Sequence, residues 1–413
     1  MGRTLLLADE PRHLRRRRKG YLVRKIVTLG LTTVLVALGA VPVGARLDAG
    51  PTPGGITSDN VEFIRHIPLA QDGVGGKPIG DYFYANDQNK IMIFDTATPE
   101  DPQLVGFVPM PQEWLFSRED LDGNDSVIVI ANTVTASADG SPSAGTNALY
   151  IIDVEDKTNP QIVGKLPGAG SHTSSCILDC RYVYNSNGQI IDIRNPAKPK
   201  LAKTKWGDGK PVNSGHDVTE IARGIVLTAS NPLMLLDARK NPLNPKLLAV
   251  SPPIEKVSVM HSVRWGRNGK DSFFVAGSEQ NFVARCGAET NGHLMTIDAS
   301  KWKKTHTLGP VIDRHYETNG TYVDGKPAAN QGGCSSHWLE LHPTFAQGGL
   351  MAHARFEHGT RFMSVSRKGK ISEVGYFMPW AGSTGASYWI TDRVVYALDY
   401  NRGIDVIKYN GKL

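Results

Sequence analysis

The clearest pattern along the chain is a repeated alternation of apolar runs and turn residues. Four segments end an apolar run with an aspartate and place a proline seven or eight residues later, before another apolar group: Ile93–Asp95 with Pro102, Ile151–Asp153 with Pro160, Ile190–Asp192 with Pro199, and Leu235–Asp237 with Pro245. Aspartate and proline suit the two ends of a turn, because aspartate bonds nearby backbone and proline fixes φ. Each segment therefore predicts a strand, a turn and a second strand.

A further apolar run precedes each of these segments. The four runs are Tyr82–Tyr84, Val127–Ile130, Tyr182–Tyr184 and Ile225–Leu227. Three less regular copies follow, beginning at Phe273, Leu350 and Val394. Seven units of about 47 residues lie within the period of β-propeller blades. The pattern therefore predicts an all-β fold, a seven-bladed β-propeller over residues 61–413.

The two ends of this predicted propeller complement each other. The last unit stops at Leu413 without a fourth strand, whereas Val61–Ile67 has the character of an outer strand and no unit of its own. We expect this N-terminal strand to close the last blade, because closure removes exposed sheet edges. Residues 46–60 then form a linker ahead of the propeller.

Two of the repeats carry a family resemblance. Ala148–Val154 and Gln189–Ile193 resemble the repeats of the LVIVD-repeat proteins, which are exported β-propellers of bacteria and archaea. The similarity covers roughly residues 60 to 410. It implies the fold and export of the chain, but it implies no activity, because that family has no common one and a fold does not by itself give a function.

The N-terminal 45 residues have the layout of a secretory signal. The basic cluster Arg15–Lys19 precedes eighteen uncharged residues, Ile26–Val43, and small residues follow around Ala45. This order predicts a signal peptide with cleavage near residue 45. An uncleaved membrane anchor through residues 26–43 is the alternative, because eighteen residues approach the length of a membrane span. Either way, we expect a secreted or cell-surface protein.

Most of the positive charge belongs to this leader. The chain has a formal net charge of +6, and its first 25 residues hold nine Lys and Arg against Asp9 and Glu10. The other residues therefore carry a net charge of −1. Nucleic-acid binding is excluded as the main function, because it requires positive charge on the folded surface.

Four cysteines, Cys176, Cys180, Cys286 and Cys334, are expected to form disulfides in an exported chain. The segment from Cys176 to Cys180 resembles a tight hairpin turn, which would join these two and leave Cys286 with Cys334. A metal site using C-x3-C is the alternative, and the absence of any C-x2-C spacing disfavours it.

Histidines recur at one register of the repeat. His172, His216, His261 and His337 precede the second-strand run in four successive units. This places each at the start of an innermost strand, around the mouth of the central channel. Neutral imidazole binds Cu, Zn or Fe, so the four could hold a transition metal such as Cu or Zn. The alternative is structural, with each imidazole bonded to the backbone of the next blade.

Three long insertions are expected on the same face as the histidines. Residues 133–147 and 277–292 join second to third strands, and residues 309–336 join one blade to the next inner strand. Loops on a rigid scaffold commonly carry binding sites. The candidate binding residues there and near His337 are Arg285, Glu289, His315, Tyr316, Glu317, Tyr322, Glu340 and His342.

No nucleophile elbow, phosphate loop, zincin helix or dinucleotide motif is present in the sequence. The leading hypothesis is a monomeric exported propeller that binds a ligand or a cell-surface protein through its loop face and channel mouth. The alternative is a metal-dependent enzyme that uses the channel histidines. Metal analysis of the purified protein would discriminate between the two.

Overall fold

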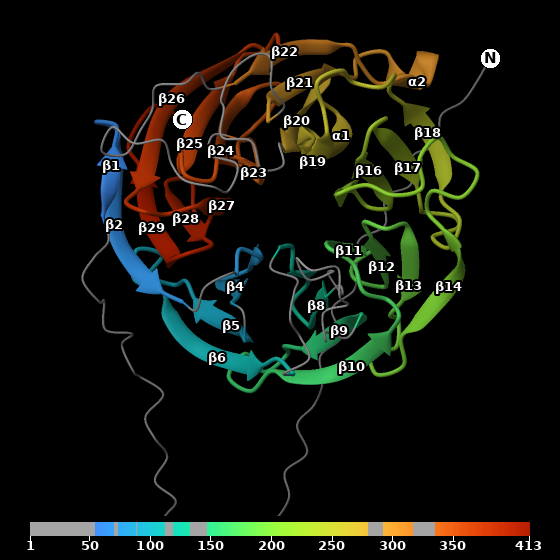
Figure 1. The fold of residues 1–413 in the computed structure, drawn as a ribbon, viewed down its shortest axis with the longest axis horizontal. Helices are drawn as coiled ribbons and strands as arrows, with labels where there is room; N and C mark the ends of the chain where they lie inside the picture. The colour runs from blue at the N-terminus through green and yellow to red at the C-terminus, as the bar shows by residue number, and fades with distance from the viewer. Residues whose placement is uncertain are drawn as a thin grey trace, which may run out of the picture. The chain divides into compact units, whose positions relative to one another are not determined.

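The computed structural model describes residues 54–69, 73–87, 89–111, 119–132, 147–279, 292–316 and 335–413. These residues form seven antiparallel sheets arranged in a ring, which confirms the seven-bladed β-propeller (Figure 1). The predicted signal or anchor segment, residues 1–45, lies outside the described residues.

Five blades have four consecutive strands each. In each blade the strands are given from the inner to the outer one. The first blade consists of β3 (Gly76–Ile79), β4 (Tyr82–Asn86), β5 (Lys90–Asp95) and β6 (Gln103–Pro109), and the second of β7 (Asp122–Gly123), β8 (Val127–Asn132), β9 (Ala148–Asp153) and β10 (Gln161–Pro167). The third consists of β11 (Ser174–Ile177), β12 (Tyr182–Asn185), β13 (Gln189–Asp192) and β14 (Lys200–Lys205), the fourth of β15 (Asp217–Ala222), β16 (Ile225–Ala229), β17 (Met234–Asp237) and β18 (Lys246–Val250), and the fifth of β19 (Val259–Arg264), β20 (Phe273–Glu279), β21 (Leu294–Asp298) and β22 (Val311–His315).

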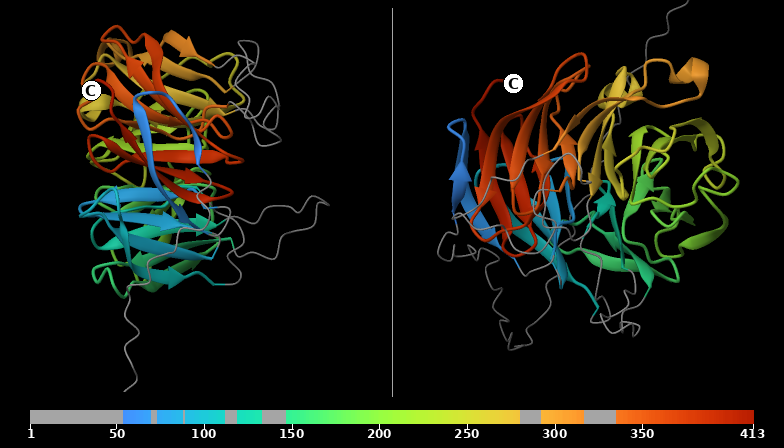
Figure 2. Two further views of the ribbon diagram at one scale, coloured as in Figure 1. Left: turned by 90° about the vertical axis from the view of Figure 1, so that its left-hand side faces the viewer. Right: turned by 45° about the horizontal axis from the view of Figure 1, so that its top comes forward.

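The last two blades recruit strands from the N-terminal end of the propeller. The sixth is β23 (Leu339–Leu341), β24 (Gly349–Ala354), β25 (Thr360–Val365) and β26 (Ile371–Pro379), with β1 (Gly55–Thr57) as a fifth strand; the seventh is β27 (Thr384–Trp389), β28 (Val394–Asp399) and β29 (Gly403–Tyr409), with β2 (Val61–Pro68) outermost. The side views in Figure 2 show β1 and β2, in blue, on the outer rim against the red strands. Strands from the N-terminal end of the propeller therefore complete both blades.

Among the described residues, helix is confined to two single turns, α1 (Gly266–Gly269) and α2 (Trp302–Thr305). Within the described part of the chain, no helix has the length and apolar character needed to cross a membrane.

Two segments expected to lack regular structure contain strands. Within residues 46–60, the predicted linker, Gly55–Thr57 forms β1 and pairs with β26. Within residues 309–336, predicted as a connection between blades, Val311–His315 forms β22 and pairs with β21. A register shift between Thr296 and Ile297 interrupts that pairing. The sequence pattern missed both strands because they lack the turn signature and are only partly buried.

The repeated aspartates explain the regular turns between third and fourth strands. The carboxylate of Asp95 accepts a hydrogen bond from the backbone N–H two residues later, at 2.7 Å. Asp153, Asp192, Asp237 and Asp298 repeat this bond in the next four blades. Such turns join strands whose apolar side chains are covered by the neighbouring blades. The blades therefore stack face to face around a central axis, where the inner strands begin.

Candidate metal centre

The inner strands bring four histidines from successive blades to one place near the axis. His216 directly precedes β15, His172 and His337 lie two residues ahead of β11 and β23, and His261 is the third residue of β19. The distances between ring centroids are 4.6 Å for His172 and His216, 3.8 Å for His216 and His261, and 4.0 Å for His261 and His337. The four imidazoles therefore form one continuous cluster.

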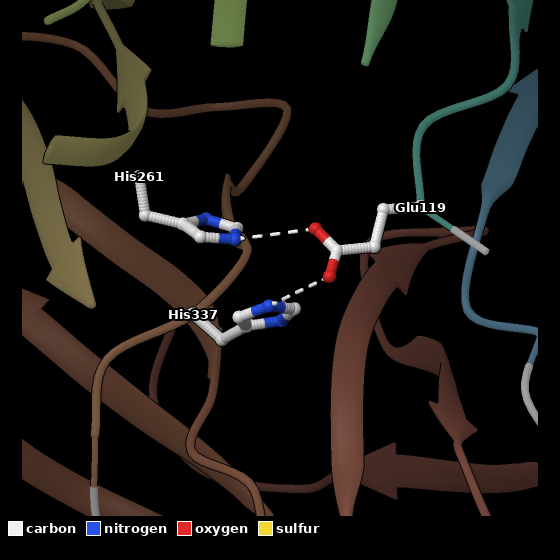
Figure 3. A group of neighbouring side chains, drawn as sticks. All are labelled: Glu119, His261 and His337. Carbon is white, nitrogen blue, oxygen red and sulfur yellow. Dashed lines mark ion pairs between the residues drawn. The ribbon is translucent and has the colours of Figure 1, made fainter. Parts of the chain in front are cut away.

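Glu119 places a carboxylate in the middle of this cluster. Its Oε2 lies 3.5 Å from Nε2 of His172, 3.9 Å from Nε2 of His216 and 3.3 Å from Nε2 of His261. Its Oε1 lies 3.4 Å from Nε2 of His337. Figure 3 shows the carboxylate pointing at the rings of His261 and His337. All four Nε2 atoms thus face a single acidic group.

Sequence reasoning missed Glu119, although it occupies the register of the histidines. It lies three residues ahead of β7, so the second blade contributes a glutamate where the next four blades contribute histidines. The signal was hidden because β7 contains only Asp122 and Gly123 and offers no apolar run to align. The hydroxyl of Tyr400, also not predicted, donates a hydrogen bond of 2.7 Å to Glu119 Oε1.

Several polar atoms of the centre are buried without a hydrogen bond. His261 and His337 are fully buried. The Nε2 atoms of both rings and Oε2 of Glu119 lack a hydrogen-bond partner, as does Nδ1 of His216. Unpaired buried polar atoms are costly and uncommon in folded proteins. A ligand bound at this point would satisfy them.

The orientation of His337 is fixed from behind. Its Nδ1 lies 2.5 Å from the backbone oxygen of Gly385, in β27 of the next blade. The Nδ1–H group donates this bond, so that in the neutral ring Nε2 is the unprotonated nitrogen, and Nε2 is directed at Glu119. Metal-binding histidines typically use their second nitrogen in this way.

The charges of the centre are strongly coupled. Burial opposes ionisation of Glu119, but His337 and His172 hold its pKa well below the usual range. The pKa values of His172 and His337 are raised. Burial alone would lower them, but the attraction of the Glu119 carboxylate for the protonated rings outweighs the effect of burial. Burial and the neighbouring imidazoles lower the pKa of His216, and they lower that of His261 to about 3. At neutral pH, the two middle rings of the row, His216 and His261, are therefore neutral, as metal ligands must be.

The donors form compact sets suited to a metal ion. Donor atoms lie within 4.8 Å of one another in three sets among the described residues: Glu119, His261 and His337; Glu119, His172 and His216; and His216, His261 and Glu279. Two imidazoles and one carboxylate are a common donor combination for Zn. Glu279, at the end of β20, was not predicted, and its pKa is raised by burial.

Other predicted residues lie elsewhere. Glu340 lies on β23, where its carboxylate accepts a 2.6 Å bond from Arg264 at a cavity of about 330 Å³. His342 bonds to Thr344 and to the backbone of the seventh blade. His315 ends β22, the outer strand of the fifth blade, and belongs to none of the three donor sets.

Of the two predicted disulfides, the structure describes one. Cys176, on β11, and Cys180, in the following turn, form a disulfide, which confirms that pair. The predicted partners Cys286 and Cys334 lie outside the described residues, as do the loop candidates Arg285, Glu289, Glu317 and Tyr322.

Comparison with known proteins supports the fold alone. No family model matches the chain, so the resemblance to the LVIVD-repeat proteins remains an expectation. No curated protein matches it either. Two similar solved structures are described as "Structure of U3-55K" and "Crystal structure of RRP9 WD40 repeats". Each has a TM-score of 0.54 and 8% identity; the first alignment covers 85% of this chain and 99% of the other, and the second covers 86% and 98%.

Proposed function

We propose that the protein is a metal-dependent propeller, in which His172, His216, His261, His337 and Glu119 bind a transition metal at the mouth of the central channel. The observation that carries this proposal is the convergence of four imidazole nitrogens on one buried carboxylate. Side chains from five successive blades meet there.

The structural explanation of the histidines accounts for less of the geometry. It requires each imidazole to bond the backbone of a neighbouring blade. Nδ1 of His337 makes such a bond, but its Nε2 and both nitrogens of His261 have no hydrogen-bond partner. Buried imidazole nitrogens without a hydrogen bond, as in His261, would destabilise the folded protein. A metal ligand explains the same arrangement without this cost.

Imidazole with a carboxylate suits Zn, Cu or Fe, and Zn or Cu is the metal that we propose for an exported chain. A bound ion would act as a Lewis acid on water or on a small ligand. The chain's own groups would hold and orient that ion. Tyr400 fixes one oxygen of Glu119, and Gly385 fixes the ring of His337. A secreted or cell-surface location is part of this proposal.

A binding module without catalysis is the second candidate. The propeller fold supports it, because the fold presents loops from many blades on one face. Partners of this module would be a small ligand or a cell-surface protein. The metal distinguishes the two candidates.

Elemental analysis of the purified mature chain tests the proposal. After incubation with Zn²⁺ or Cu²⁺ and removal of free metal, we expect at least one ion per chain. The double variant His261→Ala with His337→Ala should bind less metal than the parent protein. Substitution of the exposed His306 by glutamine provides the control and should change nothing. A parent chain that retains no metal would leave the binding module as the better account.

A further inference from the structure

The donors of the centre are not arranged equally around one point. Two of the compact sets contain different pairs of histidines: His172 with His216 in one, and His261 with His337 in the other. Glu119 is the member that both sets share. The row of rings runs from His172 to His337, so the two pairs lie at opposite ends of the cluster. Each pair comes from two adjacent blades, and the third set joins the middle histidines, His216 and His261, to Glu279.

A single ion bound by all four histidines would require their nitrogens to lie closer together than these sets provide. Two ligands on opposite sides of a single ion, each at 2.0 to 2.1 Å, are separated by at most about 4.2 Å. Compact sets of donors, with atoms within 4.8 Å, contain only two histidines each in the described part of the chain. A single ion can therefore take one pair and the carboxylate without rearrangement, and it leaves the other pair unused.

The carboxylate is placed to serve both pairs. Its Oε1 lies 3.4 Å from Nε2 of His337, and its Oε2 lies 3.5 Å from Nε2 of His172 and 3.3 Å from Nε2 of His261, so the carboxylate contacts histidines of both pairs (Figure 3 shows the contacts with His261 and His337). A carboxylate with one oxygen toward each ion is the usual bridge in two-metal sites, where the ions are about 3.5 to 4 Å apart. Its negative charge offsets the repulsion between neighbouring dications. Glu279 adds a second carboxylate beside the two middle histidines, His216 and His261.

We propose that the centre binds two transition-metal ions, one held by His172 and His216 and the other by His261 and His337, with Glu119 as the bridge. This inference rests on the proposed metal-dependent function and specifies its metal content. Each ion has two imidazoles and one carboxylate oxygen from the chain. Three protein ligands leave a position for water or substrate, which is the pattern of catalytic zinc sites. The substrate class that fits is one with an oxygen atom able to bind across both ions.

The decisive measurement is the number of ions bound by the parent protein. The mature chain is titrated with Zn²⁺ in a calorimeter, and the ions that remain after gel filtration are counted by elemental analysis. Two ions per chain are expected. A single ion per chain would overturn the two-ion centre and keep the proposed function. No bound ion would overturn both.

Spectroscopy of the same parent protein gives an independent test that does not depend on any variant folding. Co²⁺ is added stepwise, and its electron paramagnetic resonance is recorded. Two ions that share the Glu119 carboxylate couple magnetically, so the signal per bound ion should weaken as the second site fills. A signal that rises in proportion to two bound ions would place them in separate sites and would contradict the bridge.

Variants then assign the ions to their ligands. The double variant His172→Ala with His216→Ala should bind one Zn²⁺, and so should His261→Ala with His337→Ala. Glu119→Gln retains the size of the side chain but cannot bridge with two anionic oxygens, so it should bind no more than one ion tightly. The matched control, His306→Gln, should retain two. If either histidine pair is removed and two ions still bind, the assignment is wrong.

Discussion

Closure of the ring by β2 predicts a measurable loss of stability from a single substitution, Ile67→Ala. Ile67 lies opposite Ile404 in the register of β2 and β29. Its side chain is 6% exposed. It packs in a cluster that joins the seventh blade to Phe83 and Met92 of the first blade. The substitution therefore acts where the two ends of the ring meet.

The magnitude follows from burial. Replacement of a buried isoleucine by alanine costs about 2 to 5 kcal/mol, through lost apolar contact and the cavity that remains. For a cooperative body of this size, each 1 kcal/mol lowers the Tm by roughly 1 to 2 °C. A decrease of roughly 2 to 10 °C is therefore expected. Removal of the whole strand should have a larger effect, because Val61 and the buried bond between His66 and Asp405 are lost as well.

Thermal unfolding followed by far-ultraviolet circular dichroism measures this effect. Leu201→Ala is a matched control, because Leu201 lies on the outer strand β14 but is 45% exposed. Chains that begin at Gly54 and at Leu69 compare the propeller with and without β2. If Ile67→Ala or the chain beginning at Leu69 melts at the Tm of its control, β2 does not contribute to a cooperative ring.

Three further outcomes are expected. As the pH is lowered, Zn²⁺ affinity should begin to fall before pH 6.5 is reached, because the pKa values of His172 and His337 are raised and coordination requires neutral imidazole. Calorimetry of Zn²⁺ binding in two buffers should show that protons are released, and the absence of proton release would contradict this prediction. Burial raises the pKa of Asp399 to about 7, so the folded state binds its proton more tightly than the unfolded state does. Its stabilising contribution is therefore complete below about pH 4 and declines by up to about 4 kcal/mol as the pH rises to about 7. Urea unfolding of Asp399→Asn should lack this decline, and an unchanged pH profile would refute the assignment. Peptide mapping without reduction should recover Cys286 linked to Cys334, and free thiols at both positions would count against that pairing.

The sequence by itself determined the blades. Their signals are local, because an aspartate bonds a backbone N–H only two residues away and an apolar run forms a strand that its neighbours bury. The same local register placed His172, His216, His261 and His337 at the inner strands. The disulfide between Cys176 and Cys180 could likewise be predicted, because only a short turn separates the two cysteines.

Only the tertiary structure decided which side chains meet. Glu119 and His337 are far apart in the chain, and no local pattern connects them; the curvature of the ring places their polar atoms 3.4 Å apart. The same holds for Tyr400, which reaches Glu119 from the seventh blade. Strand formation depends on neighbours along the chain, whereas a site at the axis depends on the closure of the whole ring. The sequence therefore predicted the histidines, and the fold added the carboxylate on which they converge.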